Sequence, residues 1–197
     1  PLVIFGSFPE TYLSLPLEVL ATAMREGQKL FSVVRDSKQL ACFLGVADAA
    51  GDAKGLIRQG NERVLRARLA DARFFWDQDR KALLRDRAAG LKNVLFQEKL
   101  GSYDDKTQRL KKIAGYLCDK IGAADIKSSA VEAAGLCKAD LLTEMVKEFS
   151  GLQGRMGGLY AKEEGASAAV SQAIYEHYQP GSLEDASPAS IAGAVLS

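Results

Sequence analysis

The sequence predicts a mainly α protein, in which a small α+β piece with a β-hairpin precedes a longer all-α region. Three short runs rich in β-branched and aromatic residues lie in the N-terminal quarter, where they indicate strands. After them, apolar residues recur at helical spacing, and we expect no second set of strands. The small, polar stretch 49–55 separates the two patterns, so we expect domains at 1–53 and 54–197.

The N-terminal piece is expected to contain strands at 2–5, 30–34 and 40–46, with a helix between the first two. The polar stretch 35–39 separates the second and third strands, which indicates a hairpin. Pro16 stands where a helix can begin. The apolar face of that helix, at i, i+3, i+4 and i+7, consists of Leu17, Leu20, Ala21 and Met24.

The all-α region is expected to begin with a helix at 58–77, and its best-defined start lies further along. Ser102 followed by Asp105 resembles a capping box, which predicts the first turn of a helix at 103–121. The apolar stripe of that helix is expected to face the core and comprises Tyr103, Leu110, Ile113, Ala114, Leu117 and Ile121. The other expected helices span 80–89, 128–149, 152–164 and 167–178, with a further one starting near 188.

The segment GNERVLRARLADARFFWDQD, at 60–79, predicts a helix with two distinct faces. Arg68 falls on the apolar face, where an isolated charge is costly, so we expect a structural ion pair with Asp71. A second face carries Arg63, Arg66 and Arg73, which we expect to be available to a partner. The apolar face is made of Val64, Leu65, Leu69, Ala72, Phe75 and Trp76.

Charge is distributed unevenly along the chain. The whole chain has a formal net charge of +1, whereas residues 54–120 hold 17 basic and nine acidic side chains. Lys106, Arg109, Lys112 and Lys120 lie along one flank of the 103–121 helix and add to this basic middle. An anionic partner is one explanation. Attraction between oppositely charged parts of the assembled protein, or a simply solvated face, is the other.

The sequence lacks the residues and motifs that several kinds of chemistry require. His177 is the one histidine, so a histidine-rich zinc or di-iron centre cannot be assembled from these residues. No GxSxG, Walker A or HExxH motif is present. We therefore expect no catalytic residue, no metal and no cofactor here. His177 is interpreted as a capping or packing residue, and the glycine-rich stretch 151–160 as close helix packing or a bent helix start.

The remaining composition indicates a reduced and unexported protein. Cys42, Cys118 and Cys137 have no spacing typical of a disulfide framework or a zinc knuckle, and we expect them to be mostly buried. No run reaches the roughly 18 to 20 apolar residues that a spanning helix needs. Both ends of the chain are apolar, which suggests a piece of a longer protein.

Five segments, in order, resemble a known family. Besides the segment at 60–79, the chain carries LPLEVLATAMREGQKLFSV at 15–33, VLFQEKLGSYDDKTQRL at 94–110, CKADLLTEMVKEFSGLQGRMGGLYA at 137–161 and AIYEHYQP at 173–180. Together they resemble the central part of the bacterial glycyl-tRNA synthetase beta subunit. In that family an alpha subunit makes glycyl adenylate from glycine and ATP, and the beta subunit is needed for tRNA recognition and charging.

The resemblance implies partners and cofactors for the whole enzyme. It implies a cytoplasmic α₂β₂ assembly with the alpha subunit, with tRNA(Gly) as substrate and no membrane. ATP and Mg would be used by that holoenzyme and not by this segment, which would be inactive alone. The basic side chains become candidate RNA contacts: Arg63, Arg66, Arg73, Lys106, Arg109 and Lys112.

The resemblance also implies a fold for each domain. Residues 1–53 would be the end of a B3/4-like domain, and residues 54–197 an HD-phosphohydrolase-like helical domain truncated at its C-terminus. The metal-binding His-Asp position of that fold reads Lys138-Ala139-Asp140 here, which implies a degenerate, metal-free scaffold. Three functions stay open: a non-catalytic synthetase segment that supports tRNA recognition, a helical scaffold without RNA contact, and a metal-dependent HD-type phosphohydrolase.

Overall fold

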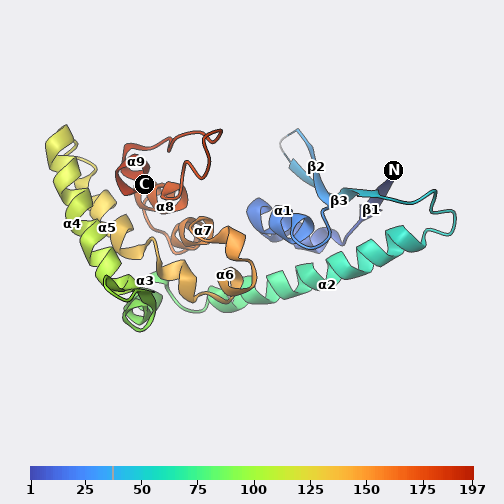
Figure 1. The fold of residues 1–197 in the computed structure, drawn as a ribbon, viewed down its shortest axis with the longest axis horizontal. Coiled ribbons are helices and arrows are strands. Elements are labelled where there is room, and N and C mark those ends of the chain that lie inside the picture. Colours follow the sequence, from blue (N-terminus) through green and yellow to red (C-terminus); the bar gives the residue numbers. More distant parts are fainter. Residues whose placement is uncertain (37) are drawn as a thin grey trace. The chain divides into compact units, whose positions relative to one another are not determined.

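The computed structural model describes residues 1–36 and 38–197, which pack as two compact units, Pro1–Gln78 and Asp79–Ser197 (Figure 1). Helices dominate the described residues and strands are confined to small sheets, so the mainly α class is confirmed. The observed division differs from the predicted one after residue 53. The long helix α2 (Leu56–Asp79) belongs to the first unit as far as Gln78, and its last residue, Asp79, belongs to the second unit.

The first unit contains an antiparallel sheet with the strand order β1-β3-β2. Its strands are β1 (Leu2–Ser7), β2 (Phe31–Arg35) and β3 (Lys38–Ala47). The predicted hairpin is confirmed as the β2–β3 pair, and β1 pairs with the other edge of β3. Part of the predicted connection 35–39 is strand, because β3 already begins at Lys38; Ser37 of that connection lies outside the described residues.

Side chains of the first unit separate into a core and an exposed sheet face. Ile4 and Phe43 are buried, whereas Phe5 and Val46 on the neighbouring strand positions are more than half exposed, as strand alternation requires. The predicted helix is confirmed as α1 (Leu17–Arg25), which follows a short 3-10 turn at Glu10–Ser14. It buries Val19, Leu20, Ala23 and Met24.

Polar contacts explain why α2 belongs to the first unit. The Ser7 N–H donates to Glu62 Oε1 at 3.0 Å, and Gln28 Nε2 donates to Asn61 Oδ1 at 3.0 Å. The apolar face of α2 is confirmed for Leu65, Leu69, Ala72 and Trp76, which are all buried. The prediction is wrong for Val64, which is 45% exposed because it lies on the flank of the buried stripe.

The second unit is helical apart from one small hairpin. Between α3 (Leu84–Ala88) and α4 (Tyr103–Ile121), strands β4 (Leu95–Gln97) and β5 (Gly101–Ser102) pair antiparallel. This hairpin contradicts the expectation of no further strands. The later helices are α5 (Lys127–Leu136), α6 (Glu144–Glu148), α7 (Arg155–Glu163), α8 (Ala168–Glu176) and α9 (Ile191–Leu196), with 3-10 turns at Ala89–Asn93, Ala139–Leu142 and Ser150–Leu152.

Two helix predictions in this unit were too long. The expected helix at 80–89 shortens to α3, and the one at 128–149 divides into α5, a 3-10 turn and α6. The division has a local cause, because the Thr143 side chain accepts from the Val146 N–H at 3.2 Å and so caps a new helix.

The predicted capping box of α4 is confirmed. The Asp105 N–H donates to Ser102 Oγ at 3.2 Å, and the Ser102 N–H donates to Asp105 Oδ2 at 2.8 Å. The predicted apolar stripe is only partly right, because Ile113 and Ile121 are 51% and 57% exposed. The core side of α4 is instead made of small and polar residues, Thr107, Ala114, Gly115 and Cys118.

The glycines of α7 allow close helix packing, as the sequence indicated. A Cβ on Gly158 would stand 2.5 Å from Tyr175 Cβ and 2.8 Å from the Ser171 carbonyl oxygen. A Cβ on Gly157 would stand 2.9 Å from Ile174 Cγ2. Only glycine therefore lets α7 and α8 approach to this distance.

Candidate functional site

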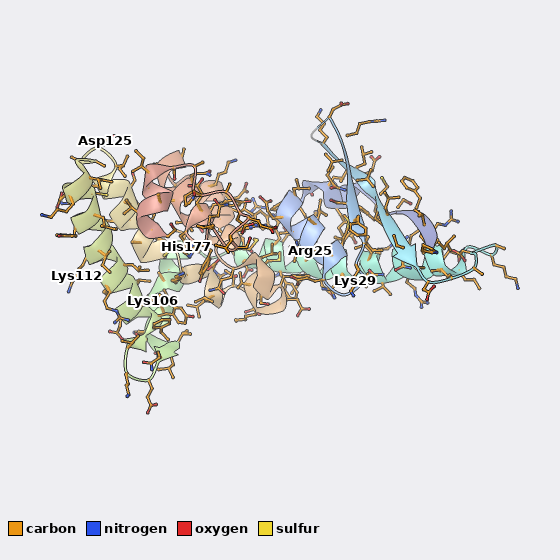
Figure 2. All side chains as sticks on the ribbon, turned by 45° about the horizontal axis from the view of Figure 1, so that its top comes forward. Arg25, Lys29, Lys106, Lys112, Asp125 and His177 are labelled. Carbon is orange, nitrogen blue, oxygen red and sulfur yellow. The ribbon has the colours of Figure 1, made fainter. Side chains whose placement is uncertain are left out.

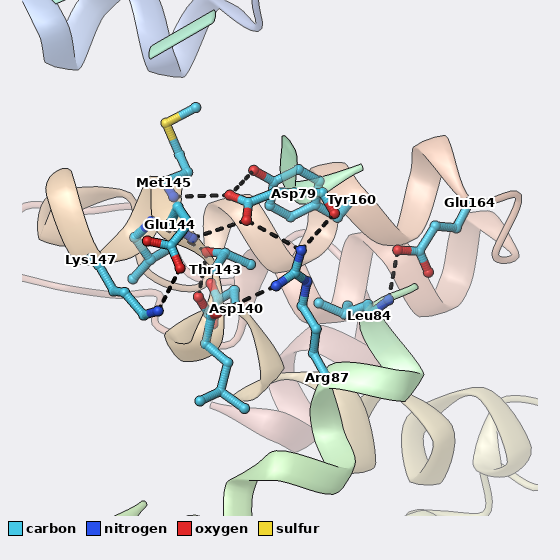
Figure 3. A network of polar contacts seen from close by, with 12 residues as sticks. Asp79, Leu84, Arg87, Asp140, Thr143, Glu144, Met145, Lys147, Tyr160 and Glu164 are labelled. Carbon is cyan, nitrogen blue, oxygen red and sulfur yellow. Dashed lines mark hydrogen bonds and ion pairs between the residues drawn. The ribbon is translucent and has the colours of Figure 1, made fainter. Parts of the chain in front are cut away.

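The second unit contains two buried polar clusters, and the first is centred on Asp79 (Figure 3). Asp79 Oδ1 accepts the Glu144 N–H at 2.9 Å, and Oδ2 accepts the Met145 N–H at 2.9 Å. The Tyr160 hydroxyl donates to Oδ2 at 3.0 Å, and Arg87 Nη2 lies 3.3 Å from Oδ1. Burial raises the pKa of Tyr160, so its hydroxyl stays a neutral donor.

This arrangement makes the Asp79 cluster structural. The carboxylate caps the Glu144 and Met145 amides at the start of α6, where a negative charge is stabilised by the helix dipole. Arg87 also donates to the Asp79 carbonyl at 2.8 Å, which fixes α3 to the same point. Through these bonds Asp79 ties α3, α6 and α7 together within the second unit.

The second cluster is formed by Lys138, Asp140, His177 and Tyr178. Lys138 Nζ lies 2.8 Å from His177 Nε2 and 3.7 Å from the centre of the Tyr178 ring. His177 Nδ1 donates to the Ile174 carbonyl, which assigns the proton to Nδ1 and makes Nε2 the acceptor of the lysine. His177 is 5% exposed, which agrees with its interpretation as a packing residue.

Asp140 is buried in the same cluster and uses only one of its two oxygens. Oδ2 accepts the Gly154 and Gly157 N–H groups, the second at 3.2 Å. Oδ1 has no hydrogen-bond partner among the described residues. Gly154 must be glycine here, because its φ is +85° and a Cβ would stand 2.5 Å from the Tyr178 ring.

Burial sets the protonation of this cluster. Desolvation raises the pKa of Asp140 to about 6, against the opposing effect of the Gly154 and Gly157 amides and of Lys138. Desolvation also lowers the pKa of Lys138 to about 8. It lowers the pKa of His177 to about 3, and the positive charges of Lys138 and Lys106 act in the same direction. At neutral pH the histidine is therefore an uncharged acceptor.

The cluster does not fit the metal centre of an HD-type phosphohydrolase. A lysine ammonium offers three donors and no acceptor, and Lys138 Nζ already occupies the space in front of His177 Nε2. Within residues 1–36 and 38–197, no three His, Cys, Asp or Glu side chains are grouped as metal ligands. Over the same residues, no helix has the length and apolar character that crossing a membrane requires. Cys42, Cys118 and Cys137 are free thiols, and the last two are buried.

The predicted RNA contacts on α2 divide into two groups. Arg63 and Arg66 are exposed and line an open concavity of about 500 Å³ together with Leu56, Gln59, Gly60 and Glu62. Arg73 is half-buried, and its guanidinium donates to the Thr11 carbonyl and to Ser14 Oγ. The expectation that Arg73 is available to a partner was wrong, because the 3-10 turn before α1 engages it.

Arg68 and Asp71 were predicted to form a structural ion pair. Arg68 is half-buried, and a Cβ on Gly27 would stand 3.3 Å from its Nη1. The arginine thus lies against the backbone turn that follows α1. Asp71 is exposed, and its pairing with Arg68 stays a prediction.

The candidates on α4 differ in how far other parts of the second unit engage their side chains. Lys106 Nζ lies 3.9 Å from the centre of the Phe96 ring, and Arg109 Nη1 donates to the Leu100 carbonyl at 3.0 Å. Both side chains therefore hold the β4–β5 hairpin against α4. Lys112 is exposed and projects from the outer side of the helix (Figure 2).

Sequence reasoning missed two sets of residues. Lys120 was placed on the basic flank of this helix, but neither it nor Tyr116 was named as a contact, although both are exposed and follow Lys112 at four-residue intervals. That spacing could have identified them. The role of Asp79 had no local signal, because its partner Tyr160 is 81 residues away in the chain.

The comparisons with known proteins place this arrangement in a family. The family model described as glycyl-tRNA synthetase beta subunit matches residues 1–197, and the chain belongs to that family. The resemblance found in the sequence is thereby confirmed. The chain is 47% identical over 199 residues to the glycine–tRNA ligase beta subunit of Desulforudis audaxviator. It is 44% identical over 202 residues to that of Acidobacterium capsulatum, and 44% over 197 residues to that of Clostridioides difficile.

These relatives are considerably longer than the chain. All residues of the chain are covered in each alignment, and they span 29% of the length of each relative. The chain therefore corresponds to a segment of such subunits.

Proposed function

We propose that this chain is a non-catalytic segment of the beta subunit of a glycine–tRNA ligase and that it supports recognition of tRNA(Gly). ATP-dependent glycylation is carried out by the alpha subunit, with ATP and Mg bound there, in a cytoplasmic α₂β₂ assembly. The second unit keeps an HD-like helical arrangement without its metal centre. The names of the relatives and the resistance of the Lys138 cluster to metal coordination support this proposal.

The observation that carries the proposal is the exposed pair Arg63 and Arg66 on α2. Both guanidinium groups border the same open concavity on α2, so both can be reached from solvent. Glu62 is the acidic residue in that lining, and it accepts a hydrogen bond from the Ser7 N–H. The concavity thus presents two arginines to solvent, which is the arrangement that phosphate recognition favours.

The test uses the complete enzyme, assembled from alpha and full-length beta subunits. Arg63→Gln with Arg66→Gln should lower the salt slope of tRNA(Gly) binding by about 2, since each phosphate contact contributes roughly 0.9. The KM for tRNA should rise, while glycine-dependent ATP–pyrophosphate exchange, which needs no tRNA, should stay unchanged. The matched control is Arg25→Gln with Lys29→Gln, which removes two exposed charges from the same unit and should leave the slope unchanged.

A helical scaffold without RNA contact is the alternative. An unchanged salt slope and an unchanged KM for tRNA in the Arg63 and Arg66 double variant would favour the scaffold. Stoichiometric bound metal together with phosphodiester turnover would instead favour the phosphohydrolase.

A further inference from the structure

The outer face of α4 carries an exposed tyrosine between two lysines. Lys112, Tyr116 and Lys120 follow one another at four-residue intervals, so they form one stripe along the helix. All three are exposed, and the Tyr116 side chain is 60% exposed. Lys120 Nζ lies 5.5 Å from the centre of the Tyr116 ring, on the same side of the helix.

This stripe lies apart from the packing of the second unit. Helix α5 contacts the opposite side of α4, where a Cβ on Gly115 would stand 3.6 Å from Val131 Cγ2. Ala114 and Cys118 on that side are almost fully buried. The aromatic ring of Tyr116 therefore contributes little to the core, and an aromatic residue is not needed there for folding.

The charge around the stripe is positive. Asp119 is the acidic residue next to it, and Lys127 Nζ lies 2.7 Å and 2.6 Å from its two carboxylate oxygens. This exposed ion pair offsets the charge of Asp119, and Lys112 and Lys120 are the exposed basic groups of the stripe itself. Ile113, 51% exposed beside Lys112, widens the apolar part of the surface.

We propose that this face binds an unpaired nucleotide of the tRNA, with Tyr116 stacking on the base and Lys112 and Lys120 contacting the flanking phosphates. The inference rests on the proposed function, because it names the part of the RNA that this second surface recognises. An aromatic ring between basic groups is the common design of sequence-tolerant binding to unstacked nucleotides. A protein partner fits less well, since lysines are depleted from protein interfaces.

The tyrosine ring can stack only on a base that has a free face, which an unpaired nucleotide provides. In the interior of a duplex, both faces of each base are covered by neighbours, so Tyr116 finds no free base face there. A flipped or single-stranded base offers one. The lysines alone would attract a duplex, and only the tyrosine distinguishes the two kinds of RNA.

The test again uses the complete enzyme, with two RNA probes: tRNA(Gly) and a blunt-ended RNA duplex of the same length. Tyr116→Ala should weaken tRNA binding by about 10-fold and change duplex binding by less than about 2-fold. Tyr116→Phe should bind tRNA like the parent enzyme, whereas Tyr116→Leu, which keeps the bulk and loses the ring, should resemble alanine. Ile121→Ala is the matched control, because it truncates another exposed apolar side chain of α4.

The lysines are tested separately. Lys112→Gln and Lys120→Gln should each lower the salt slope of tRNA binding by roughly 0.7, the value for single-stranded contacts. Equal tRNA affinity for Tyr116→Leu and the parent would overturn the inference. So would unchanged tRNA affinity of Tyr116→Ala combined with altered assembly of the alpha and beta subunits, since the face would then be a protein contact.

The failure of this inference can be told apart from failure of the proposed function. If the Tyr116 variants bind tRNA normally while the Arg63 and Arg66 double variant does not, only the inference fails. If both sets bind tRNA normally, the proposed function fails with it.

Discussion

Lys138 and Lys112 carry the same ammonium group within the same helical unit, yet their surroundings differ completely. Lys138 is 4% exposed, and its Nζ is held by His177 Nε2 and the Tyr178 ring. Lys112 is exposed on the outer side of α4 (Figure 2). The comparison teaches that the positive charge of this sequence is of two kinds. One kind has its partners inside the fold, and the other lies exposed on the surface.

The two buried carboxylates make the same point about acidic groups. Asp79 uses both oxygens, with two backbone amides, a hydroxyl and an arginine around them. Asp140 is equally buried, but its Oδ1 has no hydrogen-bond partner among the described residues. Asp79 should therefore be the residue on which the fold depends most, and Asp140 the one whose protonation changes with pH.

The largest effect is expected for Asp79→Ala. The substitution leaves Arg87 uncompensated and strips the caps from the Glu144 and Met145 amides, which should cost about 3–5 kcal/mol. Hydrogen exchange of these two amides in the full-length beta subunit measures the loss. Asp77→Ala, an exposed carboxylate on the same helix, should change stability by less than about 0.5 kcal/mol. Similar losses for the two variants would contradict the structural role of Asp79.

A smaller effect is expected for Lys138→Met, which keeps the length of the side chain and removes its charge. His177 Nε2 loses its donor, which should cost about 1–3 kcal/mol, and Lys112→Met should cost less than about 0.5 kcal/mol. The pKa of His177 should also rise above about 3, because the charge of Lys138 helps to lower it. An NMR titration, with the signal assigned by His177→Gln, measures this shift. An unchanged pKa of His177 would contradict the expected effect of the Lys138 charge on it.

The pH dependence of stability is expected to be small in the parent protein, because Asp140 and His177 contribute to it with opposite signs. The raised pKa of Asp140, about 6 against an ordinary 3.8, makes stability fall as pH rises from about 4 to about 6. The lowered pKa of His177, about 3 against an ordinary 6.5, makes stability fall as pH drops through the same range. The two contributions therefore largely cancel in the parent protein.

Asp140→Asn should remove this cancellation. The variant should lose stability on acidification by about 1.4 kcal/mol per pH unit more than the parent between pH 6 and pH 4. The free energy of unfolding of the parent and the variant is measured in the full-length beta subunit at both pH values, by urea unfolding followed through amide exchange in α7 and α8. Parallel pH profiles would show that Asp140 does not titrate in this range.

Much of the fold could be predicted from the sequence because its signals are local. The β2–β3 hairpin, α1, the buried stripe of α2 and the capping box of α4 each follow from residues close together in the chain. The β4–β5 hairpin was missed because strands of three and two residues give no periodicity. The division at Thr143 was missed because that cap competes with an apolar helical pattern on both sides.

The site could be predicted less well, for a physical reason. Which side of α4 is exposed depends on where α5 packs. Periodicity does not show that small residues such as Gly115 let α5 approach α4 closely, so Ile113 was wrongly placed in the core. Lys138 and His177 are 39 residues apart, so their contact exists only in the tertiary structure. The position of Lys138 and Asp140 could be named from the resemblance, whereas the partners that hold them could not.

One measurement tests the distinction between the two kinds of charge directly. Lysines of the complete enzyme are acetylated with and without saturating tRNA(Gly), and the extent at each site is read by mass spectrometry. We expect Lys112 and Lys120 to react without tRNA and to be protected by it. The exposed Lys162 should react in both states, and the buried Lys138 in neither. Reaction of Lys138 in the folded enzyme, or equal reaction of Lys112 and Lys120 with and without tRNA, would contradict the account.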